Sequence, residues 1–159
     1  MKPPYATIIL SAALLTAYFF LAGTALYIPG PTMASLAFQL NNSPLSAVTH
    51  LFIHVGLQHL FGNLGPLIAF GIVLELALSG LELITLFFFA GVLSSALFAL
   101  ITPGAGLLGA SAAISGMMGA AMLLKPKQTI LLLLVTPLLI YYVVYPATAA
   151  VYSVRLEQV

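Results

Sequence analysis

The polar stretch that decides the fold is residues 49–63, THLFIHVGLQHLFGN, and its later counterpart is residues 109–119, GASAAISGMMG. The first stretch holds all three histidines of the chain, and the second holds a serine at the head of an apolar segment rich in small residues. Almost everything around them is hydrocarbon. Because polar side chains are costly inside a membrane, such clusters mark candidate functional sites.

The composition indicates a membrane protein with several spans. Hydrophobic residues make up 62% of the 159 residues and charged residues only 4%, whereas a soluble domain carries about 25% charged residues. Cysteine is absent, which excludes disulfides, thiolate metal sites and cysteine nucleophiles. A net charge of +1 without a basic run gives no support for nucleic-acid binding.

Breaks rich in proline and glycine divide the chain into five apolar segments, and a spanning helix needs about 20 such residues. We therefore predict one all-α domain over residues 1–159 with five transmembrane helices. Pro66 should kink the second helix, and Pro137 and Pro146 should bend the fifth. The apolar segment 32–47 should lie on the membrane surface. The expected spans are about 5–28, 45–74, 81–101, 109–124 and 128–152.

The few positive charges favour one orientation. With the N-terminus inside, Lys2, Lys125 and Lys127 are cytoplasmic and only Arg155 is outside, as the positive-inside rule prefers. The C-terminus is then outside, and the histidine stretch and Ser111 begin from the same outer side. A plasma (inner) membrane is the simplest location for a chain without a visible targeting signal.

The histidines allow more than one interpretation. On a continuous helix, His50 and His54 share one face, whereas His59 and Asn63 share another. All four could simply form hydrogen bonds between helices. The spacing of His50 and His54 also suits a metal or haem, but no third ligand completes a set. We expect no metal and no cofactor.

Small residues recur four apart in the fourth segment, which allows another helix to approach closely. Ser111 at its head could bond back to its own helix. It could also act as a nucleophile at a helix N-terminus, where free amides can hold an oxyanion. The recurring pairs are Gly109 with Ala113, Ala112 with Gly116, and Ser115 with Gly119.

The two stretches together resemble the rhomboid family of intramembrane serine proteases, over roughly residues 49–126. In that family a His, a second His four residues on, and then His-x-x-x-Asn mark the second span, and G-x-S marks the head of the fourth. The second-span positions here are His50, His54, His59 and Asn63, followed by Gly71 and Glu75. The fourth-span positions are Gly109, Ala110 and Ser111, followed by Gly116, Gly119 and Pro126.

The resemblance implies roles for these residues. Ser111 would be the nucleophile, and His59 and Asn63 would help to form the oxyanion hole with the Ser111 amide. Segment 32–47 would be the membrane-embedded first loop of the family. Structural or site-orienting roles would fall to His50, His54, Gly109, Gly116, Gly119 and Glu75.

The chain departs from the family pattern in two ways. Ala112 stands where the family usually has glycine after the serine. The catalytic base of a rhomboid is a histidine on a sixth span, and no histidine follows His59 here. A serine nucleophile needs a base within hydrogen-bond reach, for which His59 is a substitute candidate. The predicted fold is therefore a rhomboid-like bundle of five helices that lacks the usual sixth catalytic span.

Two functions follow, so the enzymatic status stays open. The first is a catalytically incomplete rhomboid-like protein that binds transmembrane partners or is a subunit of a membrane complex. The second is an intramembrane serine endopeptidase whose catalytic histidine lies on a segment missing from this chain. Besides lipids, we expect a transmembrane helix of a substrate or partner near Gly109, Ala113 and Gly116. A transporter has little support, because Glu75 and Glu82 lie at a turn.

Overall fold

The computed structural model describes residues 3–156, and those residues form helices without a strand. Four helices are long and apolar enough to cross a membrane: Tyr5–Ala22 (α1), Leu57–Leu74 (α4), Gly80–Ile101 (α5) and Pro126–Ser153. A shorter apolar helix, Ser111–Leu124 (α6), lies among them. The prediction of an all-α membrane bundle is confirmed.

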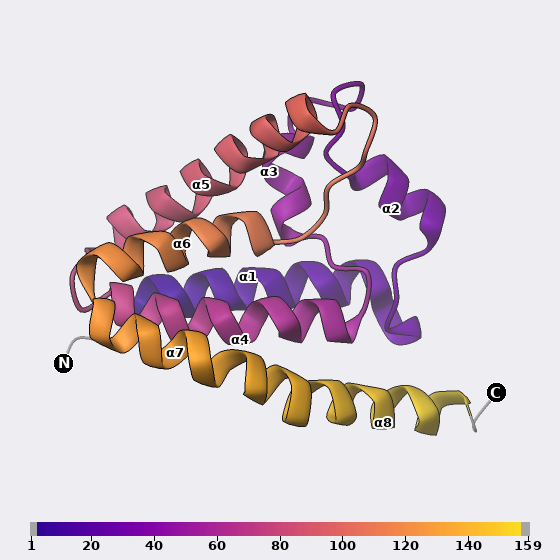
Figure 1. Cartoon of the computed structure of the whole chain (residues 1–159). Coiled ribbons are helices and arrows are strands. Elements are labelled where there is room, and N and C mark those ends of the chain that lie inside the picture. Colours follow the sequence, from indigo (N-terminus) through magenta and orange to yellow (C-terminus); the bar gives the residue numbers. More distant parts are fainter. Residues whose placement is uncertain (1–2, 157–159) are drawn as a thin grey trace.

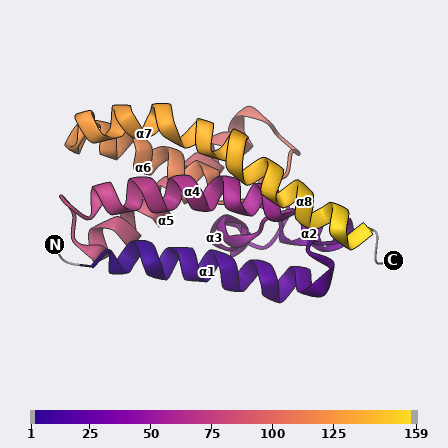
Figure 2. The same ribbon diagram turned by 90° about the horizontal axis from the view of Figure 1, so that it is seen from below.

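Helix α4 occupies the middle of the bundle. It packs against α1, α6 and the final helix, while α5 packs mainly against α6. Figures 1 and 2 show α1 and α4 running side by side, with α6 and α5 layered over them. The N-terminal end and the α6–α7 junction lie at one end of the bundle (Figure 1). The loops that carry the polar stretches lie toward the other end.

The second span differs most from expectation, because α4 begins only at Leu57. The preceding residues form two short helices, Ser46–Thr49 (α3) and His50–Phe52 (η2). Ile53 and Gly56 then have extended backbone, so the continuous helix predicted from residue 45 is broken. Gly56 forms an isolated antiparallel bridge with Tyr27 instead.

The first span also ends earlier than residue 28. After α1, a short 3₁₀ helix at Gly23–Ala25 (η1) leads to Leu26, whose backbone is left-handed. The following segment contains a short helix, Gly30–Leu36 (α2), within the predicted surface loop. A left-handed φ is unusual for a residue with a side chain, and Leu26 becomes important below.

The fifth span is one long helix with an irregular middle. It comprises Pro126–Leu139 (α7), a π-helical segment at Ile140–Val144 (η3) and Tyr145–Leu156 (α8). The π-helical segment lies between Pro137 and Pro146, the two positions at which a bend was expected. Prolines and π-bulges are the usual causes of such bends. Few side chains of this helix are buried.

Small residues hold α5 and α6 together. A β-carbon at Gly116 would overlap that of Ala90, and one at Gly91 would lie 2.7 Å from Leu51 and 3.3 Å from Ala113. Gly119, on another face of α6, has nothing within 4 Å. Close backbone approach is a usual basis of helix association in membranes, so Ala113 and Gly116 of the predicted small-residue stripe serve packing inside this chain.

This packing predicts opposite effects for two glycine substitutions on one helix. Gly116→Ala should lower the free energy of unfolding by about 1–3 kcal/mol, because it overpacks the α5–α6 contact. Gly119→Ala should leave stability unchanged or raise it by about 0.5–1 kcal/mol, because alanine favours a helix and the space is open. Equilibrium unfolding in detergent measures both, and equal losses would contradict the assignment of faces.

Glu75, just after α4, holds the start of α1. Its carboxylate accepts hydrogen bonds from the amides of Ala6 and Thr7, each at 3.0 Å, and from the Thr7 hydroxyl. A carboxylate is favourable there, because the first amides of a helix lack partners within it. Gly71 allows this approach, since a β-carbon would lie 2.5 Å from the Thr7 hydroxyl oxygen.

Removing this carboxylate should loosen α1. Glu75→Ala should cost about 1–2 kcal/mol of stability, as loss of a helix cap does, and should speed amide hydrogen exchange at Ala6 and Thr7. Glu82→Ala is the matched control, because Glu82 caps its own helix through Ser79. Equal exchange at the start of α1 in both variants would contradict this role of Glu75.

Candidate active site at the head of α6

Ser111 is the first residue of α6, and its side chain is exposed. Ala110 precedes it without a side-chain cap, so the first amides of the helix lack partners within it. Gly109 turns the chain into the helix with φ of +94°, and its amide donates to the carbonyl oxygen of His50 at 2.9 Å. The turn thus presents both a hydroxyl and free amides.

His59 and Asn63, from the first two turns of α4, lie against this turn. A β-carbon at Gly109 would lie 2.6 Å from His59 Nε2 and 3.7 Å from Asn63 Nδ2. The structure therefore brings the two predicted oxyanion residues to a position two residues before Ser111. Whether they stabilise an oxyanion stays a prediction.

One hydrogen bond orients the His59 ring, and a second joins the Asn63 side chain to the His59 backbone. The amide of Val55 donates to His59 Nδ1 at 3.4 Å, and Asn63 Nδ2 donates to the His59 carbonyl oxygen at 2.9 Å. A neutral imidazole has one donor and one acceptor nitrogen. Because Nδ1 accepts, the proton lies on Nε2, the atom that faces Gly109.

His54 lies behind His59. The two rings are 4.9 Å apart, edge to face, and His54 is fully buried. Burial, together with the nearby His59, lowers the pKa of His54 to about 4, so this imidazole is neutral at pH 7. Among the described residues its Nε2 has no hydrogen-bond partner. His54 is placed to support His59 by contact.

His50 lies in the segment before α4 and connects this segment to α5 through its side chain. Its Nδ1 lies 2.7 Å from the Ser46 carbonyl oxygen, and its Nε2 lies 3.0 Å from Ser95 Oγ. The carbonyl can only accept, so Nδ1 carries the proton. The Ser95 hydroxyl also lies 2.7 Å from the Gly91 carbonyl oxygen, so its single proton is shared between that oxygen and Nε2. Sequence reasoning missed Ser95, because a serine within an apolar helix carries no signal of its partner.

The predicted sharing of a helix face by His50 and His54 is wrong. The two residues lie on a 3₁₀ helix and in the irregular stretch after it, and His54 instead pairs with His59. The four-residue spacing therefore does not form a metal-binding pair on a helix. Within residues 3–156, no group of three or more potential metal ligands comes together.

The exposed side of α6 is not the side predicted to meet a partner helix. Ala113 is fully buried, and Gly109 and Gly116 pack against His59 and Ala90. The positions left exposed on α6 include Ser111, Ser115 and Gly119. These three residues, spaced four apart, form a stripe that we call the open face of α6.

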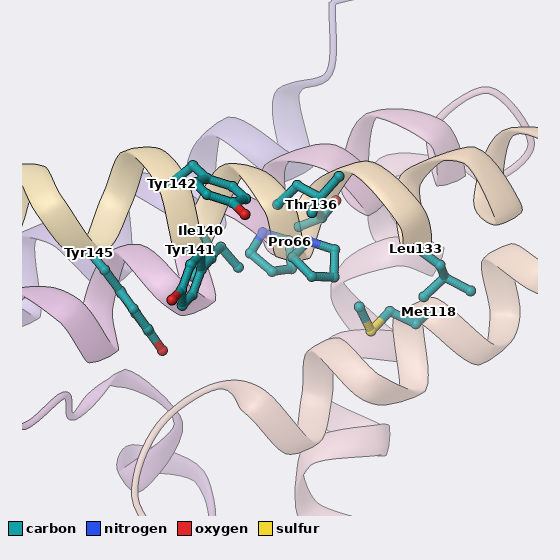
Figure 3. A pocket seen from close by; sticks show the side chains of 10 residues that line it. Pro66, Met118, Leu133, Thr136, Ile140, Tyr141, Tyr142 and Tyr145 are labelled. Carbon is teal, nitrogen blue, oxygen red and sulfur yellow. The ribbon is translucent and has the colours of Figure 1, made fainter.

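A cavity of about 520 Å³ lies between α4, α6 and the long C-terminal helix. Figure 3 shows Met118 of α6 near Leu133 of α7, and Pro66 of α4 beside Thr136. Tyrosine side chains from η3 and α8 line the same cavity. Met118 follows Ser111 by two helical turns, or about 10 Å along the helix. The cavity therefore contacts α6 about two turns after the serine.

Gly109 both adopts a positive φ and leaves room for His59. Two glycine substitutions should separate these roles. Gly109→Ala and Gly104→Ala both place a side chain at positive φ, a strain of about 1–2 kcal/mol. Only Gly109 has neighbours, since Gly104 has nothing within 4 Å. We expect a larger loss of thermal stability and a displaced His59 signal in the NMR spectrum of Gly109→Ala alone. Equal changes in both variants would contradict the contact with His59.

Comparison with known proteins agrees with this geometry. The family model described as Rhomboid domain matches residues 41–158. Rhomboid-related protein 2 of Mus musculus is 30% identical over 131 residues, which cover 75% of this chain and 42% of that protein. The chain thus spans less than half the length of this relative. No solved structure matches this chain. The chain belongs to the rhomboid family of integral membrane proteins.

Proposed function

We propose that this rhomboid-family protein is an intramembrane serine endopeptidase with Ser111 as its nucleophile. The observation that carries the proposal is the meeting of His59 and Asn63 at Gly109, two residues before Ser111. A nucleophile needs donors placed around the developing oxyanion, and here two side chains and the start of α6 converge on one turn.

The proposed chemistry assigns one task to each group. Ser111 Oγ attacks the carbonyl carbon of a peptide bond in a substrate's transmembrane helix, and its proton passes to a general base. The Ser111 amide, the proton on His59 Nε2 and the Asn63 amide stabilise the oxyanion. The base then protonates the leaving amine, and water hydrolyses the acyl-enzyme.

His59 is a poor candidate for the base, because its Nδ1 accepts from Val55 and its Nε2 proton faces Gly109. We propose that a histidine on a further helix supplies the base, and that this helix packs on the open face of α6. The space around Gly119 is open, which suits a closely packed helix. Ala112, where the family usually has glycine, is half-buried beside this face.

The substrate class that fits is a transmembrane helix, with the surrounding lipids as the other contacts. Such a helix would approach the exposed Ser111 at the head of α6, beside the helix that packs on the open face. This proposal replaces the earlier expectation of contact at Gly109, Ala113 and Gly116, since those residues are covered within the chain.

A second candidate function is binding of a transmembrane partner without catalysis, as a catalytically incomplete rhomboid or a subunit of a complex. It is favoured because Ser111 Oγ makes no hydrogen bond to a base within residues 3–156. The same open face of α6 would then hold the partner helix.

We propose an N-in, C-out orientation in a plasma (inner) membrane. Lys125 caps the start of α7 and Lys127 is its second residue. The α6–α7 junction lies at the end of the bundle where the described chain starts (Figure 1), which would place both lysines on the cytoplasmic side with the N-terminus. Lys2, which the charge argument also uses, lies outside the described residues.

Labelling of the natural full-length protein with a fluorophosphonate serine-hydrolase probe tests the proposal. Wild type should be labelled, and Ser111→Ala should abolish the label because the nucleophile is gone. Ser153→Ala is the matched control, since Ser153 is an exposed serine on α8, outside the site, and donates to the Ala150 carbonyl. This control should keep the label.

The result also separates the two candidate functions. An unlabelled wild-type protein with a normal unfolding transition would exclude the peptidase and favour the binding protein. Label that survives in Ser111→Ala would show that another residue reacts, which would also contradict the assignment of the nucleophile.

A further inference from the structure

Tyr152, near the end of α8, connects the long C-terminal helix to the start of α4. Its hydroxyl accepts a hydrogen bond from the amide of Leu57 at 2.8 Å and donates one to the carbonyl oxygen of Leu26 at 3.1 Å. Among residues 3–156, both hydrogen bonds from this helix to the first half of the chain come from Tyr152. Figures 1 and 2 both show α8 passing the start of α4.

The amide that Tyr152 binds belongs to the first residue of α4. Such amides have no partner within their own helix, and Gly56, the residue at the cap, has no side chain that could accept from it. Gly56 also makes room for the tyrosine, because a β-carbon there would lie 2.7 Å from the Tyr152 hydroxyl oxygen. The φ of Gly56 is −164°, which any residue adopts, so the requirement for glycine is steric.

The carbonyl that Tyr152 binds belongs to Leu26, the described residue other than glycine with a positive φ. Tyr18 of α1 donates to the same oxygen, so both lone pairs of that carbonyl are used. Tyr18 and Tyr152 thus share Leu26, but only Tyr152 also reaches Leu57. This difference separates the two tyrosines experimentally.

The residues that Tyr152 holds are the residues that orient His59. His59 lies two positions after Leu57 in the first turn of α4, and its Nδ1 accepts from Val55, which directly precedes Gly56. The carbonyl of Val55 accepts from Ile28 at 3.4 Å, so the segment after α1 fixes the same short stretch. A shift of this stretch would therefore move the imidazole that faces Gly109.

We propose that Tyr152 is a positioning residue for His59, through which the placement of α8 sets the oxyanion side of the site. The role of His59 in this statement depends on the proposed peptidase function. The structural part of the inference, that the Tyr152 hydroxyl sets the position of the His59 ring, does not depend on it.

The test compares three variants of the natural full-length protein. Tyr152→Phe removes both hydrogen bonds and keeps the ring, and Gly56→Ala displaces the hydroxyl without changing it. Tyr18→Phe is the matched control, because it removes a hydrogen bond to Leu26 and leaves Leu57 bound. Thermal unfolding in the same detergent tests whether each variant is folded. If Tyr152→Phe does not fold, Gly56→Ala decides whether the hydroxyl positions His59.

The first measurement is the imidazole Cε1 resonance of each histidine in ¹³C-labelled protein, assigned with His50→Gln and His59→Gln. Tyr152→Phe and Gly56→Ala should move the His59 resonance and leave that of His50, which is held by Ser95, in place. Tyr18→Phe should move neither. An unmoved His59 resonance in Tyr152→Phe, or an equal shift in Tyr18→Phe, would overturn the proposal.

The second measurement is the rate of fluorophosphonate labelling of Ser111. We expect a decrease of about fivefold in Tyr152→Phe and Gly56→Ala, the effect of about one hydrogen bond, and an unchanged rate in Tyr18→Phe. An unlabelled wild type would refute the peptidase while the NMR comparison still decided the role of Tyr152. A labelled wild type with equal rates in all variants would refute the positioning role alone.

Discussion

The close contact between the His59 imidazole and Gly109 is the interaction on which the candidate site depends. It brings the first turn of α4 to the head of α6, and it exists because Gly109 has no side chain and tolerates a positive φ. Other parts of the bundle hold these two pieces in place. Gly116 sets α6 against α5, and the hydrogen bond from the Gly109 amide to the His50 carbonyl fixes the turn itself.

Most side-chain hydrogen bonds of this apolar chain are local, but a few polar side chains bind partners on distant elements. Glu75 caps α1, His50 reaches Ser95 on α5, and Tyr152 reaches both Leu26 and Leu57. Each of these contacts joins two elements that hydrophobic packing alone would leave free to slide, since lipid tails are as apolar as the helices. The polar residues therefore specify one arrangement of the bundle, and the same arrangement builds the site.

The amino-acid sequence by itself determined the class of the protein, the number of apolar segments and the family. Composition and the 20-residue length of a span restrict the chain to membrane helices, because no other backbone structure in these segments satisfies its own hydrogen bonds in lipid. The motif residues Ser111, His59 and Asn63 were identified from their spacing and their resemblance to the family. The expectation that these residues meet at one turn rested on that resemblance.

Only the tertiary structure decided where the second helix begins and which polar groups meet. No proline interrupts residues 45–56, so the sequence pattern gives no strong signal of the extended stretch that ends the helical path before Leu57. The partner of His50 is 45 residues away and that of Leu57 is 95 residues away. Such pairings depend on how helices pack, and helices that are apolar on every side carry no periodic signal of the face they will bury.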